Sequence, residues 1–467
     1  HFTAQGGDAA RRQVESLISS WLKDFERWNV TAWQPDVLAS RIIAWLSNAR
    51  MAASTSDLVY HSSVMRSMAR QARHLARTAH RARDGLPRLR AAIGLMYSGF
   101  CLPDGEDRLK KGRRLLEQEL SRQVLPDGGL ISRDPSDIFA ALKDLVALRT
   151  DLQQAGEEVP VSLQNAIDRL APMVRFFRLG DGKLALFNGS FEEDEGMIDA
   201  VLAASRAEGR PVTSAIHSGF QRAEAGDVIL ILDAGAPPKG DLSVDAHCGT
   251  SAFEMSVGGF RLITSCGSSE QLSLGWQRAS RATAAHSTLT IDNRNSAVIR
   301  PNQKIGTGPK TVKAVREEGD DGIGLEVRHD GYLGRLGVDH IRRLHLSANG
   351  RTLYGQDRVV NPYQKPPKHS LVLDVRFHLH PDVEMHSAGD GVDLSLPDGR
   401  RFRLSCRNAD LATEESIYMG ERGNPRATHQ LVISTRADGP ETLIDWQLVE
   451  LTNEDTDNHT NGNKEEA

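Results

Sequence analysis

Two histidines, His247 and His286, are the side chains best suited to chemistry in the stretch 244–292. Both lie next to segments rich in β-branched and aromatic residues, and a Gly-Gly pair between them predicts a hairpin turn. An imidazole at the end of a strand can act as a base, hold a metal or bind a carboxylate. The alternative is a plain β-hairpin with two ordinary histidines. We expect the two rings to face each other.

Other side chains suited to an acidic ligand are spread along the chain. Arg133, Arg278 and Arg281 can each hold a carboxylate through charge-assisted hydrogen bonds. A helix-capping or salt-bridged Arg133, and solvated loop charges at the other two positions, are the alternatives. Tyr332 is a candidate acid or base, and a tyrosine that anchors a turn at a strand end is its alternative.

Two polar pairs have i, i+2 spacing in predicted strands, which places both members of a pair on one side of the strand. They are His340 with Arg342 and His378 with His380. Because an antiparallel sheet commonly has one solvated face, we expect both pairs on such a face.

The whole chain has 467 residues and a formal net charge of −5. This length allows two or three domains, and the mildly negative charge does not indicate a nucleic acid as partner. No apolar run is long enough to span a bilayer. Residues 66–90 are dense in arginine, which predicts solvated helix faces or, alternatively, a surface for an anionic polymer. The four cysteines form no C-x-x-C pair, so we expect no disulfide framework.

The elements that must position these residues follow from the hydrophobic pattern. In residues 1–205 apolar side chains recur at i, i+3 and i+4, as in Val14, Leu17 and Ile18, which predicts an all-α domain of paired helices. From residue 211 to 452 short alternating strands with turns such as Asn349-Gly350 predict a large antiparallel β-sandwich. The polar, acidic tail 453–467 predicts disorder.

Several motifs, in this order along the chain, resemble the heparinase II/III-like polysaccharide lyase family. In this sequence they are LPDGGLISRDP (125–135), His247 with SAFEMSVGGFRLITSCG (251–267), AAHSTLTID (284–292), HDGYLGRLGVDHIRRL (329–344) and FHLHPDV (377–383). The resemblance implies an N-terminal (α/α) incomplete toroid followed by a large antiparallel β-sandwich. It also implies an acidic, uronate-containing polysaccharide in a cleft and its cleavage by β-elimination. That reaction needs a group that neutralises the uronate carboxylate, a base for the C5 proton and an acid, usually tyrosine, for the leaving oxygen.

The sequence departs from the family pattern at three places. Asp245 stands where members often carry the first histidine of an H-x-H pair. Cys266 follows Ser265 where an Asp-Ser-Gly piece commonly supplies a metal-binding carboxylate, and Asp137 stands where many members carry the tyrosine of a Tyr-His pair. Three hypotheses therefore stay open: an acidic-glycan lyase, a catalytically degenerate polysaccharide-binding protein, and a metal-dependent glycan hydrolase.

A bound metal, if present, would be a structural zinc or calcium held by His247 and His286, with Cys266 as a substitute thiolate ligand. The family resemblance implies a bacterial protein of the periplasm or cell envelope. The chain begins with His1 rather than Met, so a targeting segment upstream would not be seen, and a cytoplasmic location stays open.

Overall fold

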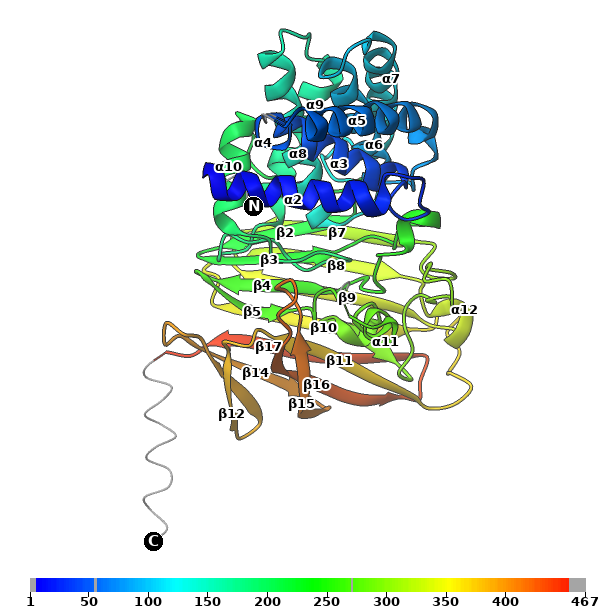
Figure 1. Cartoon of the computed structure of the whole chain (residues 1–467). Helices are drawn as coiled ribbons and strands as arrows, with labels where there is room; N and C mark the ends of the chain where they lie inside the picture. Colours follow the sequence, from blue (N-terminus) through cyan, green and yellow to red (C-terminus); the bar gives the residue numbers. More distant parts are fainter. Residues whose placement is uncertain (1–5, 54–56, 270–271, 453–467) are drawn as a thin grey trace. The chain divides into compact units, whose positions relative to one another are not determined.

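The computed structural model describes residues 6–53, 57–269 and 272–452, and these form two compact units (Figure 1). The first unit contains residues up to 131, with 139–171 and 201–209, and is helical. The second contains 132–138, 172–200 and the chain from 210 onward, and its sheets are antiparallel. The predicted order, helical region first and antiparallel sheets second, is confirmed. Segments 132–138 and 172–200, which we had expected in the helical domain, belong to the second unit. The tail 453–467 lies outside the described residues.

Helix α6 (Leu86–Phe100) lies in the core of the first unit. It packs against α3 and α7 and is buried on almost every side, as expected for a helix that is apolar all round. Glycines allow the close approach: a Cβ at Gly94 would lie 2.7 Å from that of Ala39. The α-helices among the described residues up to 205 are α2 (Gly7–Phe25), α3 (Pro35–Ser47), α4 (Ala49–Ala52), α5 (Leu58–Thr78), α6, α7 (Glu106–Gln123), α8 (Pro135–Gln154), α9 (Val161–Phe177) and α10 (Glu195–Ser205).

Helix α5 carries the arginine-rich part of the sequence. Asp57 caps its first turn by accepting hydrogen bonds from the backbone amides of Val59 and Tyr60. Four arginines at helical spacing are exposed along its length: Arg66, Arg70, Arg73 and Arg77. The prediction that these arginines lie on a solvated helix face is confirmed.

Two large antiparallel sheets form the second unit. One has the strand order β1-β2-β3-β4-β5-β11-β16-β15, with β6 paired to β11, and the other β12-β13-β14-β17-β10-β9-β8-β7. Their bounds are β1 (Ser214–Ala215), β2 (Phe220–Ala225), β3 (Val228–Asp233), β4 (Phe253–Val257), β5 (Phe260–Thr264), β6 (Leu289–Ile291), β7 (Val312–Gly319), β8 (Gly322–His329), β9 (Asp339–Ser347), β10 (Thr352–Val360), β11 (Leu371–Leu379), β12 (Glu384–Ala388), β13 (Gly391–Ser395), β14 (Arg401–Arg407), β15 (Asp410–Tyr418), β16 (Arg426–Ala437) and β17 (Glu441–Glu450). Short helices α11 (Leu274–Ser280) and α12 (Leu333–Leu336) lie in the connections.

The inner faces of the two sheets share one hydrophobic core. Phe253 and Phe377 come from the first sheet and Trp446 from the second, and the Phe377 and Trp446 ring centroids are 4.7 Å apart. The predicted turns at Gly258 and Gly350 are confirmed, and both glycines have the positive φ that such turns favour. This packing makes the unit a sandwich.

The expectation of solvated i, i+2 pairs was wrong for His340, Arg342 and His378, which are buried. His340 and Arg342 both bind Asp357, and His378 binds the hydroxyl of Ser416. Burial is tolerated because these polar groups have partners inside the protein.

No helix in the described part of the chain is both long and apolar enough to cross a membrane. The four cysteines are free thiols in the structure.

Candidate functional site

The candidate site lies within the second unit, where two loops bring His247 and His286 together. His247 follows the 3-10 turn Gly240–Ser243 and precedes β4, and His286 follows the 3-10 turn Thr283–Ala285 and precedes β6. Their ring centroids are 5.1 Å apart with an interplanar angle of 48°. The expected proximity of the two rings is confirmed.

Both imidazoles are buried and uncharged. His247 is 3% and His286 1% exposed. Burial lowers the pKa of His286 to about 3, and burial together with His286 and Arg281 lowers the pKa of His247 well below its usual value. His247 Nδ1 and His286 Nε2 are buried and have no hydrogen-bond partner. Buried polar atoms in proteins are usually paired, so these two nitrogens are available to a ligand or a water molecule.

Two aspartates approach Gly189, the residue that follows Asn188. A Cβ added to Gly189 would lie 2.7 Å from Asp134 Oδ2 and 3.4 Å from Asp245 Cβ. Asp134 is buried, and burial followed by the charges of Asp137 and Asp245 raises its pKa well above the usual range. The surroundings of Asp134 therefore disfavour additional negative charge.

Asn188 connects the loops of the site. Its side-chain oxygen accepts from the backbone amide of His247 at 3.1 Å, and its side-chain nitrogen donates to the carbonyl of Arg133 at 2.6 Å. Arg133, Asn188 and Ser251 all have positive φ, between 55° and 70°. Left-handed backbone at residues other than glycine is uncommon and concentrates at functional sites, where the surrounding structure maintains it.

The guanidinium of Arg133 is already bound by groups of the protein itself. It donates to the carbonyls of Ser218, Gly219 and Ala236 and forms an ion pair with Asp233. These contacts use four of its five N–H donors, so they argue against the predicted role in binding a substrate carboxylate.

The other two predicted arginines differ in exposure. Arg281 is buried and donates to the carbonyls of Ala246 and Ser243, at 2.7 and 2.8 Å, so it holds the loop that carries His247. Arg278 is exposed on α11 and donates to the carbonyl of Arg300 at 3.3 Å. Arg281 lies near enough to His247 for its charge to lower the pKa of that imidazole, and binding of an acidic ligand by these arginines stays a prediction.

Tyr332 is fully buried at the start of α12. Its hydroxyl donates to the carbonyl of Leu289 at 2.9 Å, and burial raises its pKa. These contacts match the alternative interpretation, a tyrosine that anchors a turn, and argue against the predicted acid or base role.

The donors at the histidine pair do not fit the predicted zinc or calcium. Among the described residues, no group of three or more His, Cys, Asp or Glu side chains could hold a metal ion. The thiol of Cys266 contacts His378 Nδ1 and Ser416 Oγ, at 3.5 and 3.8 Å. Zinc takes four ligands and calcium six to eight oxygens, so two imidazoles are too few. A metal here stays a prediction for elemental analysis.

The sequence reasoning missed Asn188, Gly189 and Asp134. An Asn-Gly pair favours left-handed backbone, and this was the available signal for the loop that contacts His247. Asp134 precedes Pro135 and accepts from the amide of Ser136 at 2.8 Å, a typical arrangement for the start of a helix.

Comparisons with known proteins agree with this architecture. The profile of the family described as Heparinase II/III-like, C-terminal, matches residues 207–447. The chain is 33% identical over 462 residues to FtsZ-localized protein C of Caulobacter vibrioides, an alignment that covers 96% of this chain and 79% of that relative.

Solved structures of polysaccharide lyases share the fold. Heparinase III superposes with a TM-score of 0.76 at 13% identity, with 96% of this chain and 74% of that chain covered. Heparan sulfate lyase HepC of Pedobacter heparinus gives a TM-score of 0.65 at 18% identity, with 96% and 74% covered. A chondroitinase AC lyase gives 0.55 at 8% identity, with 97% and 73% covered. The predicted fold, a toroid-type helical region followed by antiparallel sheets, is the fold of these lyases.

Proposed function

The chain belongs to the heparinase II/III-like family, and from that premise we propose that it is a non-catalytic member that works in an assembly with FtsZ. The relative from Caulobacter vibrioides, named for its localisation to FtsZ, supports the second half of this proposal. The carboxylates around Gly189 are the observation that carries the first half.

β-Elimination begins by neutralising the uronate carboxylate, which makes the C5 proton acidic enough to remove. Asp134, Asp137 and Asp245 supply the opposite condition, because burial and then the charges of Asp137 and Asp245 already raise the pKa of Asp134. A uronate placed beside Asp134 would add a further negative charge to this cluster. The negative charge of the three aspartates therefore opposes the binding and activation of a uronate next to them.

Tyrosine is the usual acid of this reaction, and among the described residues no tyrosine hydroxyl hydrogen-bonds to His247 or His286. All six tyrosines lie in the described part of the chain. Four hydroxyls donate elsewhere: those of Tyr60, Tyr97, Tyr332 and Tyr418 bind Ala52, Asp151, Leu289 and Glu192, respectively. The two others, Tyr354 on β10 and Tyr363 in the following loop, are exposed.

The basicity of the histidines points the same way. A general base works best when its pKa lies near the operating pH. With its pKa at about 3, His286 is a weak proton acceptor. The pKa of His247 is also well below its usual value. A buried, neutral pair of this kind is poorly suited to proton abstraction.

Co-sedimentation with FtsZ polymers tests the assembly half of the proposal. The purified chain should pellet with FtsZ polymers assembled in GTP. It should stay in the supernatant with FtsZ in GDP, because the same polymers do not form there. A fluorescent fusion should form a band that coincides with FtsZ in dividing cells. A chain that stays soluble beside FtsZ polymers, and is spread evenly through the cell, would contradict the assembly role.

Acidic-glycan lyase activity is the second candidate, favoured by one observation. The unpartnered nitrogens of His247 and His286 lie in the motif that resembles the lyase family. In this alternative one of them removes the C5 proton, and the product carries a C4–C5 double bond that absorbs in the near ultraviolet. The catalytically degenerate polysaccharide-binding protein is the related case in which glycan binds and no such product forms.

A further inference from the structure

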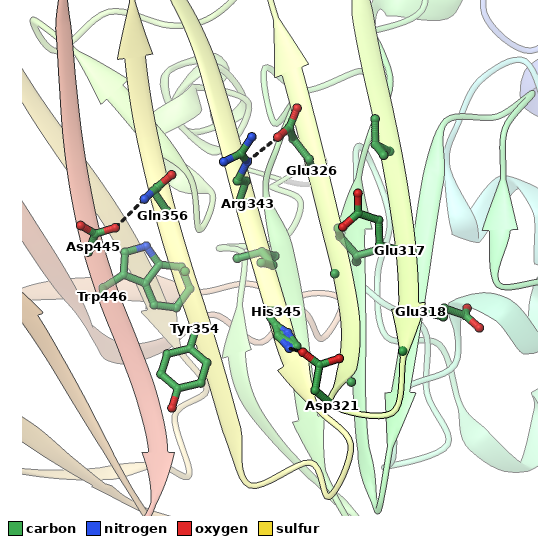
Figure 2. A pocket seen from close by; sticks show the side chains of 17 residues that line it. Glu317, Glu318, Asp321, Glu326, Arg343, His345, Tyr354, Gln356, Asp445 and Trp446 are labelled. Atoms are coloured by element: carbon green, nitrogen blue, oxygen red, sulfur yellow. Dashed lines mark hydrogen bonds and ion pairs between the residues drawn. The ribbon is translucent and has the colours of Figure 1, made fainter.

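A groove lies on the outer face of the second sheet, where it crosses β7, β8, β9, β10 and β17. Its volume is about 930 Å³, which is in the size range of ligand sites in proteins. Figure 2 shows polar and aromatic side chains standing along it from neighbouring strands. None of the residues discussed for the histidine pair lines it.

Glycine makes the hollow. Strand register places Glu317, Gly324, His345 and Tyr354 in one row across four strands. Gly324 leaves the middle of this row without a side chain. A Cβ there would meet only atoms of Glu317, at 3.7 and 3.8 Å, so the space above the strand is open. The position can therefore hold a larger side chain, which would fill the groove.

The groove is strongly acidic. One arginine, Arg343, lines the groove together with five carboxylates. The five acids are Glu317, Glu318, Asp321, Glu326 and Asp445. Glu326 pairs with Arg343, Glu318 pairs with Arg316 at 2.6 Å, and Asp445 accepts a hydrogen bond from Gln356 at 2.7 Å. These contacts leave the lining with an excess of negative charge, which repels phosphate, sulfate and uronate groups and attracts cations.

An aromatic surface stands next to this charge. The rings of His345 and Tyr354 are close to parallel, with centroids 6.5 Å apart, and Tyr354 is 53% exposed. Asp321 lies 3.5 Å from His345. Lysine and arginine side chains lay their methylene groups on such rings while their charged ends reach carboxylates. An aromatic ring next to a carboxylate is therefore suited to binding a cationic side chain.

We propose that this groove binds a segment of a partner protein that carries lysine and arginine side chains. The occupant's charged groups meet Glu317 and Asp321, and its aliphatic stems cover Gly324 beside Tyr354. The inference goes beyond the proposed function. The groove lies on the solvent-facing side of the second sheet, and its role does not depend on whether His247 takes part in catalysis.

A steric variant separates a built site from general electrostatic attraction. Gly324→Leu fills the hollow and changes no charge. The probe is a fluorescent, acetylated and amidated peptide of alternating lysine, arginine and glycine, with a peptide of glutamate and glycine as control. The wild-type chain should bind the cationic peptide, and Gly324→Leu should weaken that binding by about tenfold or more. Equal affinity for wild type and Gly324→Leu would overturn the proposal.

A charge variant keeps the test valid if Gly324→Leu folds poorly. Glu317→Lys reverses a charge inside the groove, whereas Glu415→Lys makes the same change on the exposed strand β15 of the other sheet. Binding of the cationic peptide should fall several-fold in the first variant and change less than about twofold in the second. A similar loss in both would overturn the proposal. So would a wild-type chain that prefers the glutamate peptide, or a self-association that Gly324→Leu abolishes, since the occupant would then be a second copy.

Discussion

Two buried histidine pairs in the second unit have the same ring separation. The ring nitrogens of one pair are hydrogen-bonded, whereas two ring nitrogens of the other pair have no partner. The centroids of His329 and His340 are 5.1 Å apart, as are those of His247 and His286. In the first pair His329 Nε2 contacts His340 Nδ1 at 3.1 Å, and His340 Nε2 contacts Asp357 at 2.7 Å. In the second pair His247 Nδ1 and His286 Nε2 have no partner. The first pair is part of a complete network, and the second marks a site.

The complete network supports the incomplete pair. Arg342 binds both oxygens of Asp357 and donates to the carbonyls of Ser251 and Ser287, at 2.9 and 2.7 Å. Ser287 follows His286 in the chain, and Ser251 is one of the residues with positive φ. A fully paired network in the sandwich core therefore holds the loops of the site. Mutations in the network should reduce stability, and mutations in the pair should not.

Asp357→Ala should have the largest effect. Its carboxylate accepts from His340, Arg342 and Trp446, and all three would lose a buried partner. Removing one member of a buried ion pair typically costs about 3–5 kcal/mol of unfolding free energy. Urea unfolding of the purified variant measures this loss. Asp390→Ala, at an exposed position, should change the unfolding free energy by less than about 0.5 kcal/mol. Similar midpoints for the two variants would remove Asp357 from its supporting role.

Replacing one histidine of each pair by leucine tests the comparison itself. His340→Leu leaves His329 Nε2 and part of Asp357 unpaired, which should cost about 1–3 kcal/mol. His247→Leu removes an imidazole nitrogen that has no partner, so the cost should be under about 1 kcal/mol. Chemical unfolding of both variants provides the measurement. A greater loss in His247→Leu than in His340→Leu would reverse the assignment of the two pairs.

Acid should destabilise the fold through its buried histidines. Burial lowers the pKa of His286 to about 3 and that of His378 to about 4, whereas an unfolded histidine titrates near 6.5. Below that value the unfolded chain takes up protons that the folded chain does not. Each histidine then costs roughly 1.4 kcal/mol per pH unit until its folded pKa is reached.

His286→Leu should therefore flatten the decline of the unfolding free energy between about pH 6.5 and 4, relative to wild type. His386→Gln, at an exposed strand position, should leave the slope unchanged. Unfolding measured at several pH values gives the slopes. Equal slopes for wild type and His286→Leu would mean that His286 is protonated in the folded state.

Asp134→Asn should have the smallest effect and the opposite sign. Asparagine keeps the oxygen that accepts from Ser136 and removes the charge that Asp137 and Asp245 oppose. Because the folded pKa of Asp134 is raised, the wild type is penalised as pH rises through that pKa. The variant should gain about 1 kcal/mol at neutral pH, and the gain should shrink in acid. A loss of unfolding free energy at neutral pH would contradict like-charge repulsion at the site.

The order of the two regions, the hairpin turns and the histidine pair were predictable, but several strands were not. β1, β2, β7, β12 and β15 were not among the predicted strands, and all of them except β2 lie at an edge of a sheet. The sequence of β7, VKAVREEG, is exposed at nearly every position. A strand without a buried face lacks the alternation on which prediction depends, and charged edge strands also discourage further pairing between sheets.

The site was predictable where local pattern decides and unpredictable where distant partners decide. His247 and His286 flank strands and could be recognised from their neighbours. The partners of Arg133, such as Ser218 and Asp233, lie 85 and 100 residues away along the chain. Only the folded structure shows that they occupy its guanidinium. The same holds for the burial of Arg342, whose partners come from three segments.

Product formation from acidic glycans tests the central claim most directly. The purified chain is incubated with a panel of uronate-containing polysaccharides, with heparinase III as the positive control, and the near-ultraviolet absorbance of unsaturated uronate is followed. The carboxylates at Gly189 and the engaged tyrosines predict no absorbance above background from this chain. A rise in absorbance that His247→Ala abolishes, while its unfolding free energy stays unchanged, would contradict the claim that the family member is non-catalytic.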